Sequence, residues 1–314
     1  MIAALEILGG VVLLYLGGEA LVRGASRVAL RFGLSPLVIG LTVVAFGTSA
    51  PELAASLAAV YEGSEGIALG NVLGSNIANI GLILGLAALM RPLTAESVVL
   101  KREIPFMIFV SVLLVPMALD GAFQRFDGGL MLFFFVGYLF VLLRKGEAPP
   151  DVDEELGDLD PSEISVNREV VLIAVGIAML VLGSDLLVQG AVEIARYFSV
   201  SEQVIGLTLV AFGTSLPELA TSVVAARKGE GDIVLGNVIG SNIFNVLLVL
   251  GTTSLLLEIP AALAAIQRDL ITGLVFSVVV VIFLLVPKPL HLGRGEGSVL
   301  LAAYIGYIFW VFWS

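Results

Sequence analysis

VIGLTVVAFGTSAPELAASLAAVYEGSEGIALGNVLGSNIANIGLILG, residues 38–85, recurs at residues 204–251 with a constant offset of 166 and no gap. Of the 48 aligned pairs, 31 are identical. Each copy places a glutamate directly after a proline, Glu52 in the first and Glu218 in the second. The similarity continues upstream, because LGGEALVRGA at 16–25 aligns with LGSDLLVQGA at 182–191 at the same offset. The chain is therefore built from two similar halves, each with one carboxylate in an apolar setting.

The composition indicates a membrane protein. Of the 314 residues, 58% are hydrophobic and only 14% are charged, which is far from the balance of a soluble domain. The chain has no cysteine, and its one histidine, His291, lies in a short predicted loop. Haem, zinc-thiolate and histidine-based metal or catalytic sites are therefore excluded, and we expect no resident cofactor. The net charge of −11 comes largely from residues 147–169, so it does not indicate a nucleic-acid partner.

Ten apolar stretches are long enough to span a bilayer. They lie near residues 2–22, 36–60, 67–89, 103–119, 127–143, 169–190, 202–226, 231–256, 268–286 and 298–313. The sequence thus predicts an all-α membrane protein with ten transmembrane helices. Residues 1–143 form the first five-helix repeat, 144–168 an acidic linker with three prolines, and 169–314 the second repeat.

The placement of lysine and arginine predicts the orientation in the membrane. With the N-terminus outside, thirteen of the sixteen basic residues fall in inner loops. The three exceptions are Arg125, Arg196 and Arg268. We therefore expect a multi-pass cell-membrane protein with both termini outside and the acidic linker in the cytoplasm.

An odd number of crossings per half has a further consequence. The second half must enter the bilayer from the opposite side, which produces an inverted repeat. Inverted repeats are the architecture of secondary transporters, whose ion sites lie near the midplane between the repeats. A duplicated structural protein without transport is the alternative, but it does not account for the selective repetition of polar residues.

The prolines predict local breaks in two of the spans. Pro51 and Pro217 cannot donate to the carbonyl four residues earlier, so the Gly-Thr-Ser triplets at 47–49 and 213–215 should be loosened. Freed backbone oxygens at membrane depth are tolerated only inside protein or in a wet cavity. Such oxygens, with Thr and Ser hydroxyls beside them, are what hard cations bind.

The glutamates then supply the charge. One acidic residue at the centre of a membrane helix costs about 2.5–3.5 kcal/mol on insertion scales. Two facing carboxylates also repel each other, and no Lys or Arg lies within the two spans to neutralise them. A bound metal ion is the natural counter-charge. Without histidine or cysteine ligands, calcium, sodium or magnesium is favoured.

The helix after each glutamate carries a polar face. Asn71, Ser75 and Asn79 are spaced by four residues, and Asn237, Ser241 and Asn245 repeat the pattern. Taken alone, these residues could be polar contacts between helices, and Asn76 and Asn242 are interpreted in that way. Combined with the paired Pro-Glu motifs, the face predicts an oxygen cage large enough for one calcium, which takes six to eight ligands. Calcium and sodium would then compete for the same two negative charges.

The motifs GTS-x-PE and GN-xx-GSN, both present twice, resemble those of the sodium/calcium exchanger branch of the cation/calcium exchanger superfamily. The resemblance covers the whole chain and is closest to the compact prokaryotic exchangers. It implies that Glu52 and Glu218 are the central carboxylates shared by calcium and sodium, and that the first and sixth helices slide across the remaining bundle. The other ion ligands that it implies are Thr48, Ser49, Thr214 and Ser215 through hydroxyl or carbonyl oxygens, Ala45 and Ala211 through backbone carbonyls, and Ser75, Asn79, Ser241 and Asn245.

One departure concerns the driving ion. Potassium-coupled members of this superfamily have an aspartate where this chain has Asn245, so the resemblance does not extend to potassium dependence. The proton-coupled branch usually replaces the GTS-x-PE motif, which favours sodium over protons here. The leading hypothesis is a sodium/calcium antiporter that works as a monomer in the lipid bilayer, with a proton/calcium or other divalent-cation antiporter as the alternative.

Two other classes fit the sequence less well. A passive channel needs a continuous pore, usually at an oligomer axis, whereas here the polar residues lie inside one pseudo-symmetric chain. An enzyme is disfavoured because no pair of nucleophile and base is apparent.

Overall fold

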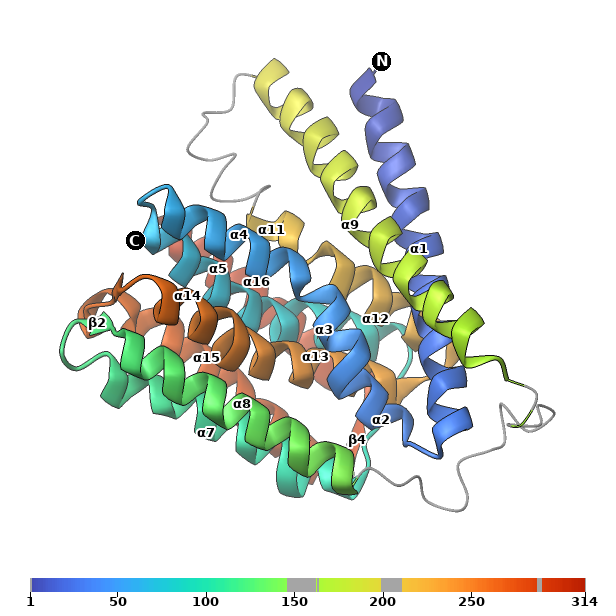
Figure 1. The fold of residues 1–314 in the computed structure, drawn as a ribbon. Helices are drawn as coiled ribbons and strands as arrows, with labels where there is room; N and C mark the ends of the chain where they lie inside the picture. Colours follow the sequence, from blue (N-terminus) through green and yellow to red (C-terminus); the bar gives the residue numbers. More distant parts are fainter. Residues whose placement is uncertain (1, 146–161, 163, 199–210, 287–289, 314) are drawn as a thin grey trace.

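The computed structural model describes residues 2–145, 162, 164–198, 211–286 and 290–313, and this part of the chain is almost entirely helical (Figure 1). In the first half, the elements are α1 Ile2–Phe32, α2 Pro36–Ile39, η1 Gly40–Val44, α3 Ala45–Thr48, α4 Ala50–Tyr61, α5 Glu65–Ala78, η2 Asn79–Leu84, α6 Gly85–Met90, β1 Leu93–Thr94, η3 Val99–Glu103, α7 Ile104–Met117, β2 Ala122–Phe123 and α8 Arg125–Lys145, where η denotes a π-helical turn.

In the second half, the elements are α9 Val166–Tyr197, α11 Ala211–Thr214, α12 Leu216–Lys228, α13 Gly231–Phe244, η6 Asn245–Leu250, α14 Gly251–Leu256, β3 Ile259–Pro260, α15 Leu263–Leu285, β4 His291–Leu292 and α16 Arg294–Trp313. Most of the predicted linker, residues 146–161 and 163, lies outside the described residues.

Six of the described helices are long and apolar enough to cross a membrane. They are Ile2–Phe32, Glu65–Met90, Arg125–Arg144, Val166–Tyr197, Gly231–Leu256 and Ile266–Leu285. Pro36–Thr48 and Ala50–Tyr61 meet the same criterion as one bent pair, with 41° between them. The all-helical membrane fold is thereby confirmed, and the number of ten spans stays a prediction.

The three remaining predicted spans fall on helical segments outside this set. Residues 103–119 correspond to α7 with the end of η3, whose Lys101, Arg102 and Glu103 interrupt the apolar run. Residues 298–313 lie in α16. The span predicted at 202–226 begins with residues 202–210, which lie outside the described part, and continues as α11 and α12.

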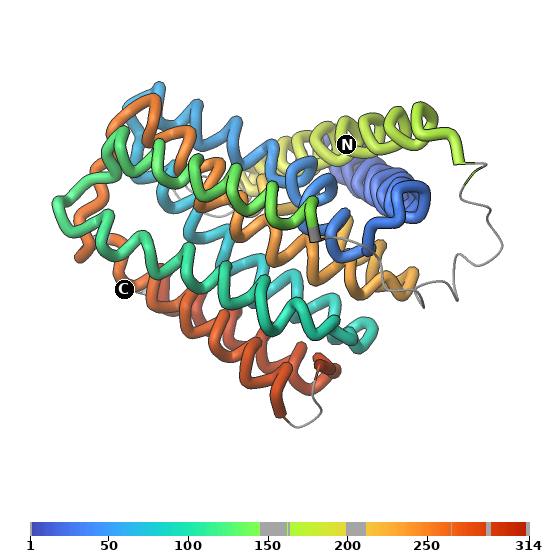
Figure 2. The backbone as a smooth tube through the Cα atoms, turned by 60° about the horizontal axis from the view of Figure 1, so that its bottom comes forward, coloured from blue at the N-terminus to red at the C-terminus, as the bar shows by residue number. Residues whose placement is uncertain are grey.

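Helices α5 and α13 form the centre of the molecule, and the outer helices pack around them (Figure 2). The stretches Glu65–Met90 and Gly231–Leu256 are by far the most buried of the six candidate spans. They also carry most of the repeated Asn and Ser residues. The polar face predicted from sequence therefore lies in the interior and away from lipid.

Helices α1 and α9 run side by side across one face of the bundle and extend beyond it (Figure 1). Their contact is built on glycine. A Cβ atom on Gly10 would lie 2.7 Å from the carbonyl oxygen of Gly183, and one on Gly17 would lie 2.8 Å from that of Gly176. The two backbones therefore touch directly, as is common between membrane helices with small residues at the interface.

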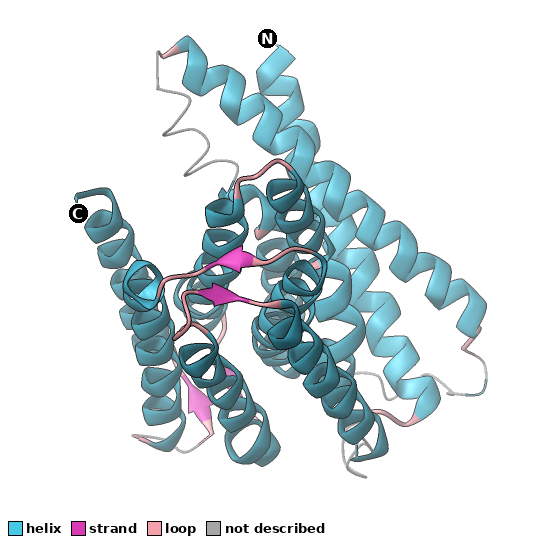
Figure 3. Ribbon diagram, turned by 60° about the vertical axis from the view of Figure 1, so that its left-hand side comes forward, coloured by secondary structure: helices cyan, strands magenta, loops and turns pink. Residues whose placement is uncertain are grey.

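Short antiparallel ladders join the two halves at opposite ends of the bundle (Figure 3). Leu93 pairs with Leu292 in the β1–β4 ladder, and Phe123 pairs with Ile259 in the β2–β3 ladder. All four of these side chains are buried. Each ladder thus anchors a loop of one half to a loop of the other.

Charged contacts gather where α1 meets α12 and α9. Lys228 Nζ lies 2.6 Å from Glu19 Oε1, and the Ser26 hydroxyl donates to the carboxylate of Glu230. Arg27 Nη1 lies 3.2 Å from Glu169 Oε1 at the start of α9.

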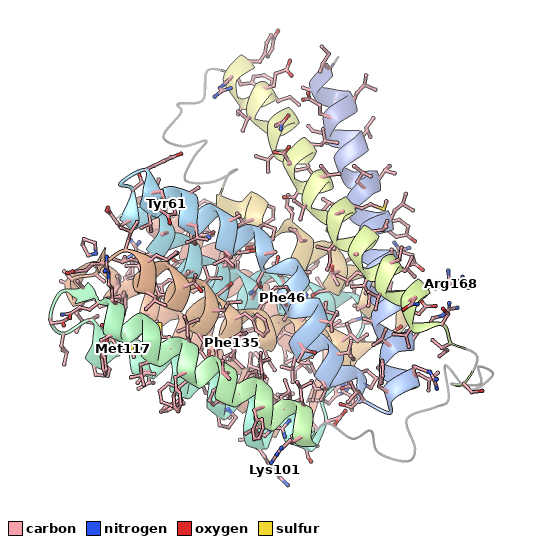
Figure 4. The ribbon with its side chains drawn as sticks, in the orientation of Figure 1. Phe46, Tyr61, Lys101, Met117, Phe135 and Arg168 are labelled. Atoms are coloured by element: carbon pink, nitrogen blue, oxygen red, sulfur yellow. The ribbon has the colours of Figure 1, made fainter. Side chains whose placement is uncertain are left out.

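In Figure 4, the labelled basic residues Lys101 and Arg168 lie on the side of the bundle opposite Tyr61 and Met117.

We expect Gly17→Ala to lower the free energy of unfolding by about 1–3 kcal/mol, because the added methyl group overpacks the backbone contact with Gly176. Gly9→Ala on the same helix is the control, since a Cβ there meets nothing within 4 Å. Alanine is also the better helix former, so Gly9→Ala should be neutral or stabilising. Thermal unfolding of the purified proteins measures both, and equal effects would contradict this account of the α1–α9 contact.

Candidate ion-binding site

Two helices break at equivalent places in the two halves. Ser49 separates α3 from α4 with φ −84° and ψ 4°, and Ser215 separates α11 from α12 with φ −87° and ψ 3°. Pro51 and Pro217 follow in the first turn after each break. The predicted loosening of the Gly-Thr-Ser triplets is thus confined to their serines, while Gly and Thr remain in the short helices α3 and α11.

The two glutamates are buried immediately after the breaks. The side chains of Glu52 and Glu218 are 0% and 1% exposed, respectively. Ser215 Oγ donates to Glu52 Oε1 at 3.3 Å, and Ser49 Oγ donates to Glu218 Oε1 at 3.1 Å. Each carboxylate therefore accepts a hydrogen bond from the serine of the opposite half.

A layer of amides behind the carboxylates ties the broken helices to α5 and α13. Asn71 Nδ2 donates to the Glu52 carbonyl oxygen at 3.2 Å and to Ser56 Oγ at 2.9 Å, while its Oδ1 accepts from Thr214 Oγ1 at 3.1 Å. The second half repeats this arrangement. Asn237 Nδ2 bonds the Glu218 carbonyl oxygen at 3.3 Å and Ser222 Oγ at 3.0 Å, and its Oδ1 accepts from Thr48 Oγ1 at 3.1 Å. These Asn–Ser pairs tie the first turn of each glutamate's helix to α5 or α13.

The remaining predicted polar ligands lie farther along α5 and α13. Ser75 Oγ is 3.1 Å from Ser215 Oγ, which links it to the Glu52 carboxylate. Asn79 and Asn245 begin the π-helical turns η2 and η6, which are rare structures found mostly at functional sites. Ser241, the counterpart of Ser75, is fully buried.

Five buried oxygens in this cluster have no hydrogen-bond partner among the described residues. They are Glu52 Oε2, Glu218 Oε2, Asn79 Oδ1, Asn245 Oδ1 and Ser241 Oγ. Leaving buried polar groups unsatisfied costs about 1–3 kcal/mol each, and more for charged groups. Carboxylate, amide and hydroxyl oxygens are the donor set of hard cations, so the cluster fits an ion such as calcium or sodium.

The two predicted backbone ligands are less clearly placed. Ala45 is fully buried at the start of α3, and its carbonyl accepts the Ser49 N–H at 3.0 Å and the Thr48 hydroxyl at 3.4 Å. Ala211 begins α11, and its side chain lies outside the described residues. The ligand roles of both alanines stay predictions.

An aromatic cluster borders α13 next to Asn245. The Phe244 ring makes edge contacts with Phe46, at 6.2 Å between ring centroids, and with Phe135, at 4.8 Å. Figure 4 shows Phe46 and Phe135 near the middle of the bundle, on α3 and α8. Phe244 is buried while Phe46 is more than half exposed, so the cluster reaches from the interior to the surface.

Residues outside the predicted ligand set complete the site. Ser56 and Ser222 were detectable, because they repeat at the 166-residue offset together with Asn71 and Asn237. Ser184 has no such signal, since its counterpart is Gly18. Its hydroxyl donates to the Gly213 carbonyl, which is the carbonyl that Pro217 leaves without a helical partner.

Comparison with known proteins identifies similar chains and structures. The family model described as sodium/calcium exchanger protein matches residues 2–144 and 168–313. The inner membrane protein YrbG of Escherichia coli is 39% identical over 100% of this chain and 98% of its own, and the sodium/calcium exchanger MaX1 of Methanosarcina acetivorans is 34% identical over 98% of each. A structure of the sodium-calcium exchanger NCX_Mj, soaked with Na⁺ and Sr²⁺, superimposes with a TM-score of 0.85 at 37% identity, covering 98% of this chain and 97% of that one.

The family match and the similar solved structures indicate a membrane ion transporter, not an enzyme. The chain belongs to the sodium/calcium exchanger family, which confirms the resemblance seen in the repeated motifs.

We expect Ser184→Ala to lower the free energy of unfolding by about 1–3 kcal/mol, because the Gly213 carbonyl then loses its hydroxyl partner. The matched control is Ser277→Ala, since among the described residues that buried hydroxyl bonds only the Gly273 carbonyl of its own helix, at 2.8 Å. Such a bond to the same helix contributes little, so the control should stay near the wild type. Thermal unfolding compares the two variants, and a control that loses as much stability as Ser184→Ala would refute the special role of Ser184.

Proposed function

We propose that this protein is a secondary antiporter that exchanges sodium for calcium, and that Glu52 and Glu218 are its central ligands. The observation that carries the proposal is the set of five buried oxygens, two of them from these carboxylates, that have no hydrogen-bond partner among the described residues. Calcium needs six to eight oxygens, and two negative charges balance its own charge. Because two sodium ions carry the same total charge, both cations would compete for one pair of carboxylates.

The proposed ligand set is the one predicted from sequence. Besides the two glutamates, it comprises Thr48, Ser49, Thr214, Ser215, Ser75, Asn79, Ser241 and Asn245 through side-chain or backbone oxygens, and Ala45 and Ala211 through backbone carbonyls. Support comes from the crossed serine–glutamate bonds and from the Asn–Thr bonds, which connect residues of the two halves around one centre. The named relatives MaX1 and NCX_Mj are sodium/calcium exchangers, which favours sodium as the driving ion here.

The proposed architecture is ten helices in two inverted repeats, residues 1–143 and 169–314, joined by a cytoplasmic linker at 144–168. Two separate matches to one family model, and hydrogen bonds repeated at the 166-residue offset, support it. We further propose that both termini face outward, that the monomer suffices for transport, and that α1 and α9 slide together to alternate access. The glycine contact between these two helices supports their motion as a pair.

The test is calcium uptake into proteoliposomes under imposed gradients. We expect sodium-loaded vesicles to take up calcium when external sodium is low, whereas potassium and proton gradients alone should drive little uptake. Glu52→Gln and Glu218→Gln should each abolish this uptake, because one negative charge cannot balance calcium. Glu62→Gln, at the exposed end of α4, is the control that should keep wild-type flux.

Two outcomes would contradict the proposal. Uptake that follows the proton gradient and ignores sodium would favour the proton/calcium alternative. Wild-type flux in either Glu→Gln variant would remove that residue from the site.

A third carboxylate at position 245 should change ion dependence. In Asn245→Asp, we expect calcium affinity to rise by about tenfold, since affinity follows the number of charged ligands. Competition by potassium or protons should become visible, because the added charge needs a partner when calcium leaves. Asn167→Asp, exposed at the start of α9, adds the same charge away from the site. Calcium binding and flux at several potassium concentrations and pH values measure both, and unchanged ion dependence in Asn245→Asp would argue against Asn245 as a ligand.

A further inference from the structure

Asparagine is an ambiguous ligand, because its side chain has two unlike ends. The oxygen attracts a cation, while the NH2 group repels it, and a rotation of the amide exchanges the two. An asparagine that serves a cation site therefore needs a partner that holds its NH2 group away from the ion. Asn79 and Asn245, two of the proposed ligands, both have such a partner.

Each partner comes from the opposite half of the chain. Asn79 Nδ2 donates to Asn242 Oδ1 at 2.9 Å, and Asn245 Nδ2 donates to Asn76 Oδ1 at 3.1 Å. The oxygens left over, Asn79 Oδ1 and Asn245 Oδ1, are both buried and both unpartnered among the described residues. The orientation of each amide is thus set by a bond on its nitrogen side.

The two partner asparagines are themselves held in place. Asn76 Nδ2 donates to the Asn242 carbonyl oxygen, and Asn242 Nδ2 donates to the Asn76 carbonyl oxygen, both at 3.2 Å. These reciprocal bonds turn the Oδ1 atoms of Asn76 and Asn242 toward the amides that they receive. Asn76 is 8% exposed and Asn242 is 3% exposed, so solvent offers little competition for these bonds.

A purely adhesive role accounts for only part of this arrangement. The reciprocal bonds between Asn76 and Asn242 would suffice to join α5 to α13. They do not require that the remaining oxygen of each should accept from a proposed ligand of the other half. That second pair of bonds leaves Asn79 Oδ1 and Asn245 Oδ1, at equivalent positions of the two halves, without a partner among the described residues.

We propose that Asn76 and Asn242 are positioning residues that orient the ligand oxygens of Asn245 and Asn79, respectively, toward the transported cation. This inference rests on the proposed ion site. Each half of the chain sets the ligand orientation in the other half. Outer-shell partners of metal ligands typically change metal affinity by about 10–100-fold when they are mutated.

The test is calcium binding to the purified protein by titration calorimetry, with variants in three backgrounds. Asn76→Leu should weaken calcium binding by about 10–100-fold, because the Asn245 amide is then free to turn its NH2 group toward the ion. A carboxylate has two equivalent oxygens and needs no such orientation. Asn76→Leu should therefore cost little when added to Asn245→Asp, and should keep its full cost when added to Asn79→Asp. Asn242→Leu should show the opposite dependence. It should cost little calcium affinity when added to Asn79→Asp, and should keep its full cost when added to Asn245→Asp.

The same fold-loss in all three backgrounds, or no loss in any, would overturn the proposal. A simple adhesive role predicts equal losses, because neither aspartate restores the bonds between Asn76 and Asn242. Thr253→Val is the control for removing a buried polar group from the same helical run, since its hydroxyl, within the part of the chain that the structure describes, bonds only the carbonyls of Val249 and Leu250. This control should bind calcium like the wild type.

A second substitution covers the case in which Asn76→Leu does not fold. Asn76→Asp keeps an acceptor for the Asn245 amide and loses only the donation to the Asn242 carbonyl, so calcium affinity should stay at or above the wild-type value. A tenfold loss there would equally overturn the proposal. If the wild type binds calcium and Glu52→Gln does not, while Asn76→Leu binds normally, only this inference fails. If the wild type itself binds no calcium, the proposed function fails.

Discussion

Two carboxylates enclosed in an apolar interior are the constraint on which the rest of the structure depends. Neither Glu52 nor Glu218 forms an ion pair with a basic side chain in the described part of the chain. Each carboxylate accepts a hydrogen bond from a serine hydroxyl of the opposite half, and its other oxygen has no hydrogen-bond partner among the described residues. The electrostatic cost that remains is one that a cation can offset. The polar residues on α5 and α13 are arranged around that requirement.

The prolines explain how each carboxylate is placed beside a serine of the opposite half. A continuous helix would satisfy its own backbone and direct Glu52 according to the helical repeat alone. The break at Ser49 bends the chain by 41° and places Glu52 in the first turn of a new helix, where Asn71 donates to its carbonyl oxygen. In the second half, the freed carbonyl of Gly213 is taken up by Ser184 from α9. The Ser184 hydroxyl thus connects α9, and with it the α1–α9 pair, to the broken helix that carries Glu218.

Much of this arrangement follows from the sequence, because comparing the two halves shows which polar residues are repeated. The repetition of Pro-Glu and of the Asn/Ser face at one offset singled out the residues that the structure brings together around Glu52 and Glu218. Cross-half partners could not be predicted in this way, since a sequence repeat states which positions are equivalent and not which ones touch. The role of Ser184, whose counterpart is a glycine, and the bonds between Asn76 and Asn242 emerged only in three dimensions. The same limit applies to the ion pair between Glu19 of α1 and Lys228 of α12, because the sequence repeat carries no signal for it.

The repeat is imperfect where α1 rests on α12. There, Lys228 reaches Glu19, and Ser26 bonds Glu230. The positions related by the 166-residue offset hold Glu62 and Asp185 in place of the ion pair, and Ser64 and Val192 in place of the hydrogen bond. Two carboxylates cannot form an ion pair with each other, and a valine side chain cannot form a hydrogen bond. The duplicated chain therefore fastens α1 to α12 with an ion pair and a hydrogen bond that the sequence does not provide at the equivalent positions of the other half, so the two halves are held to their neighbours by different forces.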